Sequence, residues 1–133
     1  MRLSDAIATG RVIVMPARQM YGNGVRGCAL GMAAKAAGLS FTVPGHPISE
    51  LISKEWPWMA MPRYLPPCDC RPDRRPDSDA HSLITHIFDA HVYHFGDWTL
   101  DQLIDWVRSV EPAEPDEVAV EATEVKEAVY AAQ

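Results

Sequence analysis

Proline restricts where regular structure can form in this chain. The 133 residues include 11 prolines, and most of them lie between Pro44 and Pro76. Proline lacks a backbone N–H and its ring clashes with the preceding helical turn, so regular structure is sparse where prolines cluster. We therefore expect helices before and after an irregular Pro-rich loop over residues 57–78.

Apolar residues at helical spacing predict helices on both sides of this loop. The first helix is expected to begin near Ser4 as its N-cap and to end at Gly10 in the left-handed conformation. The helix from Cys28 has mostly small side chains, so neighbouring backbone can approach it closely and it should be central. Thr99 with Gln102 matches the capping box of the last helix. The expected helices are residues 3–8, 28–37 and 48–56, a His-rich helix from His81 that Gly96 ends, and a helix from Thr99 to Val107.

Two short β-prone runs, Val12–Val14 and Phe41–Val43, complete the predicted elements. The chain is therefore expected to be mainly α, and a small α+β fold is the alternative. We expect a compact single domain over residues 1–111 that contains a short two-stranded element. A hydrophobic fraction of 47% is sufficient for a modest core. Residues 112–133 form an acidic segment, expected to be an amphipathic helix or a tail, with apolar residues at helical spacing: Val118, Ala122, Val125 and Val129.

The charge and the cysteine count exclude several classes of protein. A formal charge of −6 disfavours binding to nucleic acid, which depends on Lys and Arg facing phosphates. Three cysteines do not suit a disulfide framework. Neither a signal-peptide pattern nor an apolar run of membrane-spanning length is found in the sequence. We expect a cytoplasmic protein, or a virion component if the chain is phage-borne, that does not bind membranes.

Cys28 is the candidate nucleophile. It stands at the start of a predicted helix, where exposed backbone donors and the helix dipole favour the thiolate. A cysteine enzyme also needs a histidine base, and we expect His86 or His91, oriented by Asp89, to supply it. The alternative is that Cys28 is a buried small apolar residue.

The pair Cys68 and Cys70 in the Pro-rich loop is the candidate metal site. Two nearby thiols supply half of a tetrahedral zinc site, and His81, His86 or Cys28 could complete it. Zinc would also explain how a loop with few apolar residues keeps its shape. A spacing of one intervening residue is shorter than usual, and the alternative is two loop thiols without metal.

The histidines do not predict one ligand-bearing face of an α-helix. His81, His86 and His91 are five residues apart, so each step turns about 140° net around an α-helix. The pair His86 and Asp89 is the best intrahelical contact, in which the carboxylate could orient the imidazole. The alternative, which we favour, is that Asp89 and His91 cap the end of the helix.

Exposed apolar side chains in the loop would make a surface for a protein partner. Trp58, Met59 and Met61 follow one another closely, and such residues are typical of partner-binding patches if they are exposed. No Gly-rich phosphate loop is found in the sequence.

Several motifs of this chain resemble those of a family of small, uncharacterised bacterial and phage-borne proteins. They are a Leu-Ser-x-Ala-Ile-x-x-Gly helix at residues 3–10, a Cys-Ala-Leu-Gly helix start at residues 28–31, a cysteine pair in a Pro-containing loop, and a His-Leu-Asn-Asp-x-x-His type turn at residues 86–91 before a Trp-bearing helix from Trp98 to Trp106. Phe88 stands where the family tends to have Asn, and the cysteines are closer together; both departures argue against an Asn- or metal-dependent activity. The resemblance implies the architecture and an origin in a mobile element, but no reaction.

Together these patterns predict a small non-enzymatic protein that acts as a structural or accessory component, without a required cofactor, through contact with a protein partner or with itself. One alternative is a cysteine-dependent hydrolase or transferase that uses Cys28 with a histidine. The other is a zinc-stabilised regulatory protein that uses Cys68 and Cys70.

Overall fold

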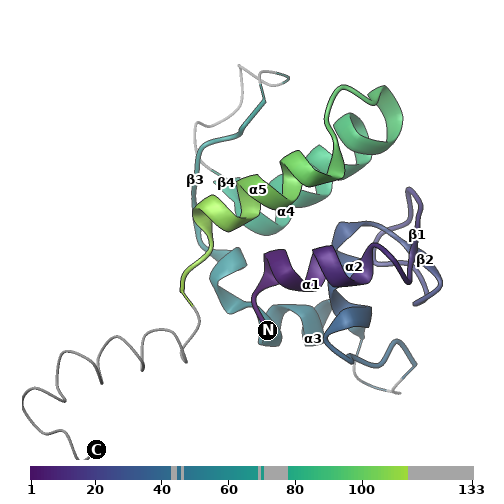
Figure 1. Ribbon diagram of the computed structural model, residues 1–133. Coiled ribbons are helices and arrows are strands. Elements are labelled where there is room, and N and C mark those ends of the chain that lie inside the picture. Colours follow the sequence, from purple (N-terminus) through teal and green to yellow (C-terminus); the bar gives the residue numbers. More distant parts are fainter. Residues whose placement is uncertain (43–44, 46, 69, 71–77, 114–133) are drawn as a thin grey trace, which may run out of the picture.

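Helices form most of the structure, a computed structural model that describes residues 1–42, 45, 47–68, 70 and 78–113. This confirms the mainly α prediction (Figure 1). α1 packs against α2 and α5, and the π-helix η2 continues directly from α4. The helices are α1 (Leu3–Gly10), α2 (Ala29–Ala36), α3 (Ile48–Glu55), α4 (Ala80–His86) and α5 (Leu100–Val110), with the short 3-10 helix η1 (Pro57–Ala60) and the π-helix η2 (Ile87–Phe95).

Two pairs of very short strands accompany the helices. β1 (Met15–Pro16) pairs in parallel with β2 (Arg26–Gly27), and β3 (Pro62–Tyr64) pairs antiparallel with β4 (Ser78–Asp79). The predicted strand at residues 12–14 is wrong, because Ile13 and Val14 both donate backbone hydrogen bonds to the carbonyl of Gly10 and continue the turn after α1.

The second predicted strand, at residues 41–43, is not found over Phe41 and Thr42. Val43 lies outside the described residues, as does the expected C-terminal helix or tail from residue 114 onwards. Parts of the expected Pro-rich loop form regular secondary structure, namely η1, β3 and β4. The described part of this region is therefore more ordered than its proline content indicates.

Small residues place α2 at the centre of the fold, as predicted. Ala29, Ala33 and Ala34 are fully buried. A Cβ atom on Gly31 would lie 2.0 Å from the carbonyl oxygen of Tyr21, and one on Gly10 would lie 2.0 Å from that of Met32. Only glycine permits these backbone approaches. Large apolar side chains fill the surrounding core, chiefly Leu3, Ile7, Leu30, Met32, Ile52, Ile84, Ile87, Phe88 and Leu103.

The ends of the helices match the predictions in part. Thr99 and Gln102 form the predicted capping box of α5, and Gly96 ends η2 with a positive φ of 71°. Ser4 is not the N-cap of α1: Arg2 holds that position, and Ser4 is buried. The expected left-handed conformation at Gly10 is also not found, since Gly10 is the last helical residue, pressed against α2.

A carboxylate from the far end of the chain closes the start of α1. Glu111, directly after α5, accepts a 3.0 Å hydrogen bond from the backbone N–H of Ser4 and another from its hydroxyl. The Nε of Arg2 lies 3.0 Å from the same carboxylate. Because the first N–H groups of a helix have no partner within it, this contact replaces a local cap and ties α5 to α1.

None of the helices in the described part of the chain has the length and apolar character needed to cross a membrane.

Candidate metal centre

The strands β3 and β4 bring the two ends of the cysteine-bearing loop together. Pro62 is paired with Asp79, and Tyr64 with Ser78. Asp79 is also the N-cap of α4, where its carboxylate accepts a 2.6 Å hydrogen bond from the N–H of Ser82. The loop therefore leaves and re-enters the fold at the start of the continuous α4–η2 helix.

Two cysteines and two histidines converge between this loop and the helix. The nearest ligand atoms of Cys68, Cys70, His86 and His91 all lie within 4.8 Å of one another. The Sγ of Cys70 is 2.9 Å from Nε2 of His91, and the rings of the two histidines are 5.2 Å apart between centroids. These four residues, here called the Cys₂His₂ cluster, lie close enough to hold one metal ion.

The π-helical geometry of η2 is the reason that His86 and His91 share a face. In an α-helix residues five apart diverge by about 140°. A π-helix joins residues i and i+5 by hydrogen bonds, so that residues five apart lie nearly one above the other. The change from α4 to η2 occurs between His86 and Ile87, which are the residues where this alignment begins.

Asp97 fixes the orientation of His91. Its two carboxylate oxygens lie 3.0 and 3.1 Å from Nδ1 of the imidazole, while Nε2 faces Cys70. The N–H of Trp98 also donates to the carbonyl oxygen of His91, at 3.2 Å. A histidine that donates one ring nitrogen to a carboxylate presents the other nitrogen to a metal in a fixed tautomer, an arrangement common around zinc.

The cluster lies at the boundary between the core and solvent. His91 is buried at 5% exposure, Cys68 and His86 are half-buried, and Cys70 is exposed. Two thiolates and two neutral imidazoles are the donor set of many tetrahedral zinc sites. The two negative sulfur atoms would also balance the charge of a divalent ion.

Of the residues predicted as metal ligands, Cys68, Cys70 and His86 are brought together, and His81 is not. The Nε2 of His81 lies 2.9 Å from the hydroxyl of Tyr21. Burial lowers the pKa of His81, and the nearby Asp79 only partly opposes this effect. His91 takes the fourth position of the cluster. The Asp that follows Gly96 is the signal that could have indicated it, since Asp97 lies beside its imidazole.

Cys28 lies outside this cluster. Its side chain is buried at 1% exposure, and its Sγ accepts a 3.3 Å hydrogen bond from the N–H of Tyr21. Among the described residues, no histidine hydrogen-bonds to this sulfur. The described part of the chain therefore does not assemble the Cys28–histidine pair that the nucleophile hypothesis requires.

Among the described residues, Asp89 makes no hydrogen bond to a histidine. Asp97 instead orients the imidazole of His91. The Oδ1 of Asp89 is buried and has no hydrogen-bond partner among the residues that the structure describes. Burial raises the pKa of this carboxyl group, and Arg18 partly opposes the rise. Asp89 instead lines a cavity of about 440 Å³ together with Arg18, His81 and His86.

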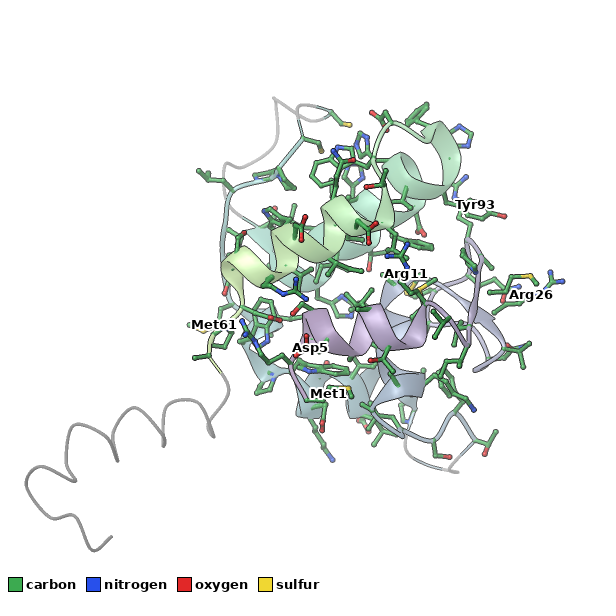
Figure 2. The ribbon with its side chains drawn as sticks, viewed as in Figure 1. Met1, Asp5, Arg11, Arg26, Met61 and Tyr93 are labelled. Carbon is green, nitrogen blue, oxygen red and sulfur yellow. The ribbon has the colours of Figure 1, made fainter. Side chains whose placement is uncertain are left out.

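The predicted aromatic and methionine patch of the loop is not formed as expected. Met59 is buried at 2% exposure and Trp58 is half-buried against Tyr64, with ring centroids 6.0 Å apart. Only Met61 is exposed (Figure 2).

No protein-family model matches the chain, and comparisons with curated proteins and with solved structures found no match either.

Proposed function

We propose that the Cys₂His₂ cluster binds one zinc ion and that the ion holds the Pro-rich loop against the α4–η2 helix. The observation that carries this proposal is the convergence of four ligand atoms within 4.8 Å, from a loop and a helix separated in sequence. Cysteine and histidine are the usual ligands of zinc, and a bound ion supplies stability that a loop rich in proline cannot obtain from an apolar core.

The zinc would be structural rather than catalytic. Catalytic zinc sites keep one position open for water, whereas four protein ligands fill a tetrahedral ion. The protein then acts as a small non-enzymatic structural or accessory component that binds other protein molecules. Reduced thiols suit a reducing compartment such as the cytoplasm.

A cysteine nucleophile is the second candidate, and one observation favours it. Cys70, His91 and Asp97 form a chain of contacts at 2.9 and 3.0 Å, which is the order of groups in a cysteine–histidine–carboxylate triad. This candidate gives no part to Cys68 or His86, although both are in the same cluster. The zinc proposal accounts for all four residues.

Metal analysis of the purified full-length chain tests the proposal. We expect about one equivalent of zinc per chain after dialysis against metal-free buffer. Replacement of zinc by Co²⁺ should give the intense visible absorption of a tetrahedral site with thiolate ligands. His86→Gln should lose the metal, and His81→Gln is the matched control, because His81 is on the same helix but outside the cluster.

Less than about half an equivalent of zinc in a folded chain would contradict the proposal. So would equal metal content in the His86→Gln and His81→Gln variants. If the metal-free chain is folded and Cys70 alone reacts rapidly with iodoacetamide near neutral pH, the nucleophile hypothesis is favoured instead.

A further inference from the structure

A patch of exposed apolar side chains surrounds the paired strands β1 and β2. Five large apolar residues between positions 12 and 25 are each more than half exposed. The N–H of Met15 donates to the carbonyl oxygen of Val25 at 2.8 Å, which holds the two parts of the patch side by side. Its members are Val12, Ile13, Met15, Met20 and Val25.

The same segment is basic in a chain that is acidic as a whole. No Asp or Glu occurs between residues 6 and 49. Arg18 and Arg26 are exposed and make no ion pair with any residue that the structure describes, while Arg11 is paired with Asp101. Arg26 points away from the body of the molecule (Figure 2). We call the five apolar residues, with Arg18 and Arg26, the β1–β2 surface.

The C-terminal sequence has the complementary chemistry. Residues 114–133 carry six acidic residues and one lysine. Their apolar residues recur at helical spacing, from Val118 to Val129. A segment with one apolar stripe and acidic flanks matches an apolar surface edged by arginines, because the apolar areas are buried together and the charges face each other.

The position of the two regions favours a second copy as the molecule that the segment reaches. α5 ends on the side of the molecule opposite to β1 and β2 (Figure 1). The acidic segment therefore starts far from the β1–β2 surface of its own chain. A second copy can present that surface to it. If each of two copies docks its segment on the other, the result is a closed symmetric dimer that adds no further chains.

We propose that the acidic segment 114–133 of one chain docks on the β1–β2 surface of a second copy. The proposal does not depend on the zinc site, since neither region contains a residue of the Cys₂His₂ cluster.

Charge reversal on each side tests this interaction. Light scattering and sedimentation of the full-length chain over a range of concentrations should show a monomer–dimer equilibrium that weakens with added salt. The surface variant Arg18→Glu/Arg26→Glu and the segment variant Glu117→Lys/Glu121→Lys/Glu124→Lys should each raise the dimer Kd by at least about tenfold. Lys54→Glu, on α3 and also exposed, is the control and should leave Kd unchanged.

Mixing the two variants gives the sharpest result. In the mixed dimer the native segment of one variant faces the native surface of the other, and the reversed segment faces the reversed surface. Both contacts are again between opposite charges, so the dimer should re-form. A wild-type chain that stays monomeric, variants with unchanged Kd, or a mixture that fails to associate would overturn the proposal. A monomer that is destabilised by the reversals in the acidic segment would show docking within one chain, which also overturns it.

Discussion

Asp97 offers a quantitative test of how the candidate metal centre is built. Its carboxylate lies 3.0 Å from Nδ1 of His91, and replacing Asp97 with Ala removes this hydrogen bond without touching a proposed ligand. Loss of such a supporting carboxylate commonly lowers metal affinity by about 10- to 100-fold. The side chain of Asp97 is 58% exposed, so solvent screens part of its charge and we expect the lower end, about tenfold or about 1.4 kcal/mol.

Zinc affinity can be measured by competition with a chelator of known zinc Kd, with the wild-type chain and the variant at the same pH. Asp97→Asn should have an intermediate affinity, because the amide oxygen still accepts a hydrogen bond from the imidazole. Asp105→Ala is the control, since that carboxylate is 77% exposed and lies 3.9 Å from Arg108, which is not part of the Cys₂His₂ cluster. If Asp97→Ala and Asp105→Ala bind zinc within about twofold of each other, Asp97 does not orient the ligand and the reasoning fails.

Three further predictions concern stability. Glu111→Ala should destabilise the fold by about 1–3 kcal/mol in urea unfolding, because the buried N–H of Ser4 loses its acceptor; an unchanged midpoint would contradict this. Gly31→Ala should cost about 3 kcal/mol or more, since its Cβ would overlap the carbonyl oxygen of Tyr21, and a near-native melting temperature would refute the close approach. The lowered pKa of His81 means that the unfolded state takes up a proton more readily. Its contribution to stability is therefore present above the ordinary histidine pKa and is lost as pH falls through and below it. Urea unfolding at pH 7.5 and 5.5 should show a smaller loss in His81→Gln than in wild type, and equal losses would disprove it.

Local signals in the sequence predict the helices well, because these signals act over a few residues. The Thr99–Gln102 capping box and the end of the His-rich helix at Gly96 depend only on their neighbours, and both are found as predicted. Tertiary contacts decide the cases that failed. Ser4 has the chemistry of an N-cap, but Glu111, more than a hundred residues away, supplies the acceptor that α1 needs.

The candidate metal centre was predicted in part for a related reason. The two cysteines and His86 were predicted from residue type, because zinc uses few kinds of ligand, although the cysteine spacing is shorter than usual. His91 was excluded as a partner of His86 by assuming α-helical periodicity. The assumption fails at η2, where π-helical hydrogen bonds align residues five apart. No periodic pattern in the sequence announces such a change.

The π-helix itself should depend on the metal. A π-helix is rare and persists where function or tertiary contact favours it, and η2 is nine residues long. The alignment of His86 with His91 benefits the chain if both imidazoles bind the same ion. The packing of Phe88, which is buried in the core on the same element, is the alternative reason for the π-helix. We therefore expect zinc to slow hydrogen exchange of the backbone amides in η2 by at least about tenfold, and those of α1 and α2 much less. If chelation leaves the exchange of η2 unchanged in a chain that held zinc, core packing alone sustains the π-helix, and the alignment of the two histidines is its consequence rather than its cause.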